Sequence, residues 1–300
     1  MSSVRILLLT LFAMIAFASN SLLCRAALRD TNIDAASFTS VRILSGAVAL
    51  WLIMMLRPSS SSHVTRHMSL ASGNWPSAFA LFAYAAAFSF AYKTLSAGSG
   101  ALLLFGAVQA TMILWGFGKG ERLRAIQILG LLAALTGLTV LVFPGLSAPP
   151  LAGSILMLSA GVAWGVYSLR GKMAGDAVSA TAGNFVRAVP FTALVSAAMI
   201  SQARLDALGL IYAIISGAIT SGLGYVIWYA ALKNLNATSA ATVQLSVPVL
   251  AATGGILLLG EPITLRYLIA SIAVLGGIFL VVVERRGSSV LTGNNQPLAK

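Results

Sequence analysis

The sequence predicts an all-α integral membrane protein, with ten transmembrane helices arranged as two inverted five-helix repeats. Composition is the first of three observations behind this prediction: the 300-residue chain is 58% hydrophobic and only 9% charged, with a mean hydropathy of +0.92. A soluble domain carries roughly 25% charged residues because its surface faces water. Most of this surface must therefore face lipid. The single cysteine, Cys24, excludes a disulfide scaffold.

Long apolar stretches are the second observation, since about 20 apolar residues span a hydrocarbon core of roughly 30 Å. Ten stretches qualify, approximately 5–28, 36–56, 75–94, 98–118, 123–143, 151–171, 178–200, 208–232, 238–259 and 264–283. Short connections with breakers, such as Pro149-Pro150 and Glu261-Pro262, separate several of them. Strand-type alternation is absent from the sequence, and the apolar runs are too long for barrel strands.

The first stretch also resembles a signal peptide, because Arg5 precedes an apolar run that ends in Ala16-Phe17-Ala18. The apolar character continues to Leu28, however, and a helix of similar character recurs later in the chain. We therefore expect a retained membrane span, with a cleaved signal as the alternative.

Basic residues are distributed unevenly between the two sides of the predicted membrane. If the N-terminus is cytoplasmic, that side collects twelve residues: Arg5, Arg57, Arg66, Lys119, Arg122, Arg124, Arg170, Lys172, Lys233, Arg285, Arg286 and Lys300. The opposite side collects four: Arg29, Lys93, Arg204 and Arg266. The positive-inside rule then predicts a multi-pass protein of the bacterial inner membrane with both termini cytoplasmic. The net charge of +12 is thereby explained by topology signals, and a nucleic-acid partner is not expected.

An internal repeat is the third observation. A shift of 140 residues aligns Ala91–Leu95 with Ala231–Leu235 and Gly120-Glu121 with Gly260-Glu261. In the first part of each half, a shift of 145 sets Arg42 on Arg187.

Each half holds five predicted spans, and because five is odd the second copy enters the membrane from the opposite face. The predicted units are residues 1–147, an inverted unit 148–286, and a cytoplasmic tail 287–300. Inverted repeats are typical of secondary transporters with a site near the midplane. A duplicated scaffold without transport is the alternative.

Several motifs resemble those of the EamA-type family of the drug/metabolite transporter superfamily. Phe17-Ala18-Ser19-Asn20 with Arg25, and Trp164-Gly165 with Lys172, are similar to the pattern that opens each half of that family. Leu259–Pro262 and Gly118–Arg122 resemble the Gly-Glu turn after its fourth helix. The resemblance covers roughly residues 5–284 and implies a ten-helix bundle that exports small metabolites, often amino acids.

One position departs from the family pattern. Pro248 lies where the family commonly has a proline in the ninth helix, but the matching position in the first half is Val108. We therefore expect the fourth helix to be straighter than its counterpart.

The sequence lacks the motifs of several enzyme classes. It has no phosphate loop, no Cys/His metal cluster and no Ser-His-Asp arrangement within the spans, so no enzyme activity, cofactor or metal is predicted. His63 and His67 share one predicted loop and are expected to be solvated.

The few acidic residues bear on the driving force. All seven fall in loops or at predicted helix ends, near water: Asp30, Asp34, Glu121, Asp176, Asp206, Glu261 and Glu284. Proton-coupled carriers usually relay through a carboxylate or histidine within the membrane. The sequence therefore favours a facilitator, with coupling through Glu121 or Glu261 as the alternative.

Candidate substrate contacts are polar or aromatic side chains within the spans, because a membrane site is built from such groups turned inward. They are Gln109, Gln244, Trp164, Tyr84, Tyr167, Asn20, Ser89, Tyr225 and Trp228. For the amides and Ser89 the alternative is helix–helix packing. For the aromatic residues near span ends it is an interfacial belt.

Two arginines occupy matched positions inside the second and seventh spans. Arg42 and Arg187 would either attract a substrate carboxylate or act as structural anchors, and the family pattern favours anchors. Together these features predict an exporter of small organic metabolites, chiefly neutral or aromatic amino acids. An exporter of lipophilic compounds or drugs, a membrane scaffold and a membrane-embedded enzyme are the alternatives. The expected partners are a small-molecule substrate and the lipid bilayer, and oligomerisation is not required.

Overall fold

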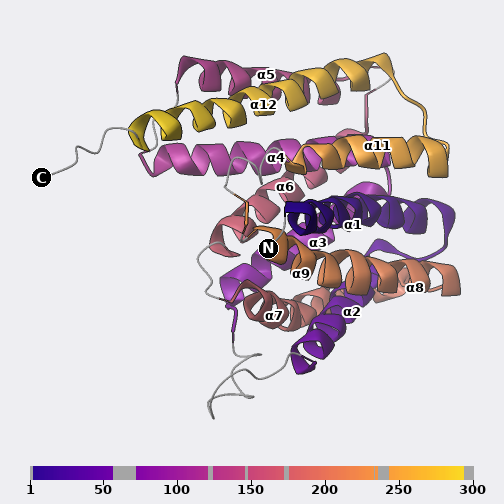
Figure 1. Cartoon of the computed structure of the whole chain (residues 1–300). Helices are drawn as coiled ribbons and strands as arrows, with labels where there is room; N and C mark the ends of the chain where they lie inside the picture. The colour runs from indigo at the N-terminus through magenta and orange to yellow at the C-terminus, as the bar shows by residue number, and fades with distance from the viewer. Residues whose placement is uncertain are drawn as a thin grey trace, which may run out of the picture.

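A computed structural model of the chain describes residues 3–56, 72–120, 124–145, 148–171, 176–232, 234–235 and 243–293. In these residues every regular element is helical, which confirms the predicted all-α class (Figure 1). The elements are α1 (Ser3–Asp30), α2 (Ala35–Met55), α3 (Trp75–Tyr92), α4 (Ala97–Gly118), α5 (Ala125–Val142), α6 (Leu151–Gly171), α7 (Ala177–Ala198), the 3-10 helix η1 (Ile200–Gln202), α8 (Ala207–Ile214), the π-helix η2 (Ile215–Leu223), α9 (Gly224–Leu232), α11 (Ser246–Leu259) and α12 (Leu265–Gly293).

Six helical segments in the described part of the chain are long and apolar enough to cross a membrane. They are α1, α2, α4, α5, α6 and the continuous segment Ala207–Leu232 that joins α8, η2 and α9. Helices also lie in each of the other predicted stretches, but the ten-span count and the inverted arrangement stay predictions. Outward-facing side chains are strongly apolar; Leu257 is 76% exposed and Ile272 is 75% exposed. Such a surface suits lipid and would be unfavourable in water.

The helices pack as successive layers in Figure 1. The pair α5 and α12 forms one edge, α4 and α11 lie beside it, α1, α3, α6 and α9 form the middle, and α2 with α7 forms the far edge. Connections 31–34, 93–96, 199–206 and 260–264 share one end of the bundle, which we call the Glu261 end. Helix α1 begins and α12 ends at the opposite end.

Glycines allow the closest helix contacts. A Cβ on Gly130 of α5 would collide with the backbone oxygen of Gly277 in α12, and the reverse is also true. Gly217 of η2 lies equally close to the backbone oxygen of Arg42 in α2. Because hydrocarbon gives helices little hydrophobic reason to associate, such close backbone packing contributes much of their attraction.

The π-helix η2 interrupts the eighth predicted span. Its wider turn, with i→i+5 hydrogen bonds, changes which side chains face the bundle, and π segments frequently occur at functional sites. Ser216, Thr220 and Ser221 are all buried here. Each forms a hydrogen bond with a side chain of α1 or α2. This segment therefore supplies a row of hydroxyl groups to the bundle interior.

Two loops at the Glu261 end, 31–34 and 199–206, are joined by hydrogen bonds. Asp34 caps α2 and also accepts a hydrogen bond from the backbone N–H of Arg204 at 2.9 Å. Asp206 caps α8 and accepts a hydrogen bond from the backbone N–H of Asn32 at 3.1 Å. Partial burial raises the pKa of Asp34, but hydrogen bonds from Ser37 and Arg204 outweigh it, so the pKa lies below its usual range.

The fourth helix and its expected counterpart differ in where they begin relative to Val108 and Pro248. Helix α4 continues without a break through Val108. Helix α11 begins at Ser246, two residues before Pro248. A proline in the first turn of a helix loses no hydrogen bond, because the amides there have no partner within the helix.

Gly217→Ala should destabilise the protein, because the new Cβ would collide with the backbone oxygen of Arg42. Overpacking of this kind costs about 1–3 kcal/mol. Gly276→Ala is the matched control: no heavy atom of the described residues lies within 4 Å of its Cβ position. Thermal unfolding in detergent should give a lower Tm for Gly217→Ala alone. Equal midpoints for the two variants would contradict the close approach of η2 to α2.

Candidate functional site

Asn20 connects three helical segments in the bundle interior. Its side-chain oxygen accepts hydrogen bonds from Ser216 at 2.7 Å and Thr220 at 3.2 Å, both in η2. Its Nδ2 donates to the hydroxyl of Tyr84 in α3 at 3.3 Å. Because Asn20 is only 5% exposed, these contacts replace the water that its amide would otherwise bind. Asn20 thus fixes α1 against α3 and η2.

Arg42 of α2 extends this network. Its Nη2 donates to the Tyr84 hydroxyl at 2.9 Å, and its Nε donates to Ser221 at 3.4 Å. The guanidinium carbon lies 4.9 Å from the ring centroid of Phe88 and 5.2 Å from that of Tyr84. Cations interact favourably with aromatic faces at such distances. The network therefore contains a fully buried positive charge.

Aromatic rings from four helices surround the same region. Trp164 of α6 has ring-centroid distances of 4.8 Å to Tyr84, 5.1 Å to Tyr225 and 5.4 Å to Tyr167. Phe17 of α1 meets Tyr225 of α9 edge-on at 5.9 Å. Tilted and edge-on pairs of this kind contribute to stability beyond their buried area.

A cavity lies among these polar and aromatic groups, and we call it the central cavity. It is lined by Phe17, Asn20, Ser21, Tyr84, Phe88, Leu104, Phe105, Trp164, Thr220 and Tyr225. Its free volume is about 20 Å³, enough for about one water molecule. An organic molecule would enter only if the surrounding helices separate.

Four of the predicted site residues line this cavity: Asn20, Tyr84, Trp164 and Tyr225. Tyr167 packs behind Trp164, with its hydroxyl 3.5 Å from Thr181. Trp228 packs against Phe17, with ring centroids 6.0 Å apart. The structure thus gathers all the predicted aromatic residues around one point.

The other three predicted residues lie elsewhere. Ser89 donates to the carbonyl of Ala85 in its own helix at 2.8 Å. Gln109 is buried in α4, one turn beyond the lining residue Phe105. Gln244 is half-buried and precedes the first residue of α11. None of the three is among the residues that line the central cavity.

Six lining residues are absent from the predicted set: Phe17, Ser21, Phe88, Leu104, Phe105 and Thr220. Phe17 and Ser21 lie three residues before and one residue after Asn20, so helical periodicity places them on the same face of α1. That signal was sufficient to find them. Leu104 and Phe105 carry no such signal, because every face of α4 is apolar.

A second and larger cavity opens at the Glu261 end, and we call it the end cavity. Its free volume is about 250 Å³. Its lining comes chiefly from connections 93–96 and 260–264, from α4 and α11, and from the residues before α6: Thr94, Ser96, Gly98, Ser99, Leu141, Ala148, Pro149, Pro150, Ala252, Ile256, Glu261, Pro262, Ile263, Thr264 and Tyr267. Several hydroxyl groups and one carboxylate make this cavity more polar than the central one.

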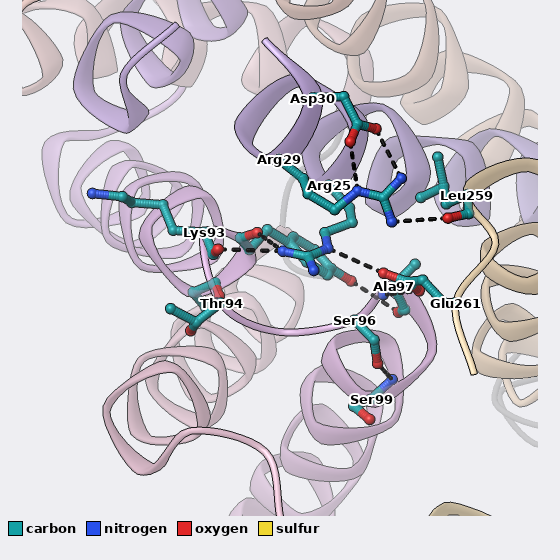
Figure 2. Close-up of polar contacts among 12 residues, drawn as sticks. Arg25, Arg29, Asp30, Lys93, Thr94, Ser96, Ala97, Ser99, Leu259 and Glu261 are labelled. Carbon is teal, nitrogen blue, oxygen red and sulfur yellow. Dashed lines mark hydrogen bonds and ion pairs between the residues drawn. The ribbon is translucent and has the colours of Figure 1, made fainter. Parts of the chain in front are cut away.

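An ion pair between Arg25 and Glu261 joins three helices and a loop at this end (Figure 2). Their Nε and Oε1 atoms are 3.0 Å apart. The second oxygen of Glu261 accepts from the backbone N–H of Ala97, at the start of α4, at 2.8 Å. Arg25 also donates to the carbonyls of Tyr92 and Lys93, at the end of α3, at 3.0 and 3.2 Å. Each charge therefore meets the helix end of opposite dipole sign.

Glu261 is more buried than its position in a loop suggests. It lines the end cavity, but it is only 8% exposed. The turn after α11 places it there: Gly260 adopts a left-handed conformation with φ of 62°, and the Glu261 N–H donates to the Gly255 carbonyl at 3.0 Å. Glycine is the residue that adopts this conformation without strain. The matching Glu121 and Lys172 lie outside the described residues, as do His63 and His67.

The ion pair lies between the two cavities. On α1, Ser21 lines the central cavity and Arg25 follows one turn later toward the Glu261 end. On α4, Phe105 lines the central cavity, whereas Ser99 lines the end cavity together with Glu261.

Arg25→Gln should lower the free energy of unfolding by about 3 kcal/mol, because it leaves the carboxylate of Glu261 buried without its cation. Glu261→Gln should cost about 1–2 kcal/mol, since Arg25 keeps its carbonyl acceptors. The double variant should lose less than the sum of the two. Thermal unfolding in detergent measures this order.

The exposed pair Arg29–Asp30 provides the control for this cycle. Arg29→Gln should cost less than about 1 kcal/mol, because solvent screens exposed ion pairs. If Arg25→Gln is no more destabilising than Arg29→Gln, the buried pair does not hold the Glu261 end together.

Comparisons with known proteins agree with a transporter fold. The sequence profile of the EamA-like transporter family matches residues 151–283. A solved crystal structure, 18% identical, covers 95% of this chain and 99% of its own length with a TM-score of 0.65. At that identity the likeness concerns the fold alone.

Several relatives match most of the chain. The uncharacterized protein PA1977 of Pseudomonas aeruginosa is 55% identical over 96% of this chain and 98% of its own length. The uncharacterized transporter YoaV of Bacillus subtilis is 23% identical over 81% of this chain and 85% of its own length. An uncharacterized transporter of Archaeoglobus fulgidus is 28% identical over 64% and 70%, respectively. Together with the apolar helical bundle, these matches lead to one conclusion: the chain is a multi-pass membrane protein that belongs to the EamA-like transporter family.

Proposed function

We propose that this transporter exports small organic metabolites, chiefly neutral and aromatic amino acids, by alternating access and as a facilitator. The lining of the central cavity carries this proposal. Aromatic rings such as Trp164 and Tyr225 provide walls for an apolar side chain, while Asn20, Tyr84 and Thr220 provide hydrogen bonds. The lining contains no carboxylate among the described residues. A zwitterion with an uncharged side chain suits this combination.

Export of lipophilic compounds or drugs is the second candidate, and the same aromatic walls favour it. Cationic drugs suit the cavity poorly, however, because the nearest buried charge is the positive charge of Arg42. A buried cation repels a cationic substrate strongly where water is excluded. A non-transporting scaffold would not explain why polar side chains line the central cavity.

Two observations support alternating access. First, the central cavity is almost filled, and the Arg25–Glu261 pair lies between it and the end cavity.

Second, helix packing is consistent with exchange of units 1–147 and 148–286. Helices α2 and α7, α4 and α11, and α5 and α12 pack in pairs across the two units. Helix α6 packs on α3 and α4, as α1 packs on α9 and α11. An inverted repeat predicts this exchange, since each unit adopts the other's shape when the protein changes sides.

The placement of acidic residues supports a facilitator. In the described part of the chain, Asp30, Asp34, Asp176, Asp206 and Glu261 lie at helix ends or in loops, and none of them lines the central cavity. Glu284, which was expected at a helix end, lies inside α12 because that helix continues to Gly293. Coupling through Glu261 is the alternative, because that carboxylate is buried beside the path between the cavities. The Lys/Arg bias supports a location of the Glu261 end outside the cytoplasm, and we propose that the end cavity is the exit.

Proteoliposomes containing the purified protein should show counterflow of neutral or aromatic amino acids in a screen of all twenty. Trp164→Ala should reduce counterflow of aromatic amino acids about tenfold, the effect typical of removing an apolar wall from a binding pocket. Trp51→Ala is the matched control, because this tryptophan is 38% exposed on the outer surface of α2. Equal loss in both variants would contradict a substrate site at Trp164.

The same proteoliposomes separate the alternatives. Flux of lipophilic compounds without flux of amino acids would support the drug exporter, and no flux of any solute would support the scaffold. A pH gradient of about two units should not drive accumulation above equilibrium if the described acids stay outside the cycle. Accumulation that a protonophore abolishes would overturn the facilitator proposal, and Glu261→Gln would then be the first variant to examine.

Variants with a single added cysteine, Ser61→Cys, Asn295→Cys and Ala148→Cys, should report in intact cells that positions 61 and 295 are cytoplasmic and that position 148 is outside. The expectation follows from the Lys/Arg bias and from α1 beginning at the end of the bundle where α12 finishes. Accessibility to a membrane-impermeant thiol reagent measures it. The native Cys24 is buried and serves as the background control. Labelling of Ser61 and Ala148 from the same side would contradict the ten-span topology.

A further inference from the structure

The buried charge of Arg42 lacks a counter-charge in the described part of the protein. Its side chain is 1% exposed, and it lies about two turns inside α2. The described ion pairs are Arg25–Glu261 and Arg29–Asp30, and neither includes Arg42. Buried charges in proteins are normally paired, because removing an ion from water is very costly.

The contacts of Arg42 use only part of its guanidinium. Nη2 donates to Tyr84 and Nε donates to Ser221, whereas Nη1 has no hydrogen-bond partner among the described residues. The rings of Phe88 and Tyr84 provide a favourable face for the cation but carry no net negative charge. One donor and one full positive charge are therefore left without a partner among the described residues.

Tyr84 connects Arg42 to the wall of the central cavity. Its hydroxyl oxygen accepts hydrogen bonds from both Arg42 and Asn20. With both acceptor positions occupied, the hydroxyl proton has no acceptor among the described residues. Tyr84 and Phe88, the two rings against which Arg42 packs, both line the central cavity. The wall thus presents a proton donor with a cation directly behind it.

Arg187, which aligns with Arg42 in the internal repeat, has a different environment. Its Nη1 donates to the backbone carbonyls of Ser72 and Gly183 at 2.8 and 3.0 Å. These carbonyls give Nη1 of Arg187 acceptors within the protein, as the anchor interpretation expects. The corresponding nitrogen of Arg42 has no such acceptor among the described residues. The contrast favours a ligand as the missing partner of Arg42.

We propose that Arg42 and Tyr84 recognise a substrate carboxylate in the central cavity. The carboxylate accepts a hydrogen bond from the Tyr84 hydroxyl, and it supplies the negative charge that Arg42, directly behind Tyr84, lacks. Charge-assisted hydrogen bonds of this kind are short and strong, particularly where water is excluded. This inference rests on the proposed transport function and narrows it: a free carboxylate is required of the substrate, whereas an ammonium group is not.

Competition with phenylalanine counterflow in proteoliposomes tests the proposal on the intact protein. Three competitors separate the two charged groups: phenylalanine, 3-phenylpropionate without the ammonium group, and phenylalaninamide without the carboxylate. In the wild-type protein 3-phenylpropionate should compete, and phenylalaninamide should be at least about tenfold weaker. This comparison needs no variant, so it decides the proposal even if a substitution at Arg42 prevents folding.

Variants then assign the preference to Arg42. Arg42→Gln should reduce phenylalanine counterflow about tenfold or more and abolish the preference for the acid over the amide. Arg42→Lys should keep part of that preference, because it keeps the charge but not the guanidinium geometry. Arg187→Gln is the matched control and should keep the preference. Elution of each variant at the wild-type volume in size-exclusion chromatography shows that it is folded.

The outcomes distinguish this proposal from the function on which it rests. Phenylalanine counterflow with equal competition by the acid and the amide would overturn carboxylate recognition and leave the transport function intact. A preference that survives unchanged in a folded Arg42→Gln variant would also overturn it. Absence of counterflow for all twenty amino acids would instead overturn the proposed transport function.

Discussion

The hydrogen-bonded amide of Asn20 is the interaction on which the interior of this bundle depends. It accepts from two hydroxyls of η2 and donates to Tyr84 of α3, so one side chain of α1 determines how three segments meet. In hydrocarbon no water replaces a lost partner, and each unsatisfied polar group costs several kcal/mol. The helices therefore keep the relative positions that preserve these bonds, and the aromatic rings around them follow.

A second constraint governs the Glu261 end. The ends of α3 and α4 approach each other there, and unpaired backbone groups of opposite dipole sign lie close together. Arg25 and Glu261 satisfy both ends and each other, and the left-handed turn at Gly260 directs the carboxylate inward. The pair lies one turn of α1 beyond the central cavity, at the wall of the end cavity. That position suits a protein for which we propose alternating access.

The two halves of the chain are alike in sequence pattern and unlike in detail. Span eight contains a π-helix, whereas α3, its expected counterpart, is a regular α-helix. Arg187 is satisfied by backbone carbonyls, whereas Arg42 shares a network with Asn20, Tyr84 and Ser221. The differences are concentrated around the central cavity. The polar interior is formed by α1, α2 and α3 together with η2, and this is where we propose substrate recognition.

The sequence by itself determined the class of this protein, because lipid as a solvent requires few charged residues and apolar runs long enough to cross the hydrocarbon core. It also identified the EamA-type motifs and the aromatic residues that meet around Trp164, since a tyrosine or tryptophan deep in a span lies too far from the membrane surface to belong to an interfacial belt. It did not reveal that Gln109 and Gln244 lie outside the lining of the central cavity or that Glu261 is buried, because spacing along one helix does not show which neighbour covers each face. Only the tertiary structure decided those contacts. The pairing of Arg25 with Glu261 joins residues 236 positions apart, and Arg42 meets Tyr84 only through the packing of α2 on α3. Such partners depend on which helices pack together and at what angle, and a local sequence pattern does not determine either.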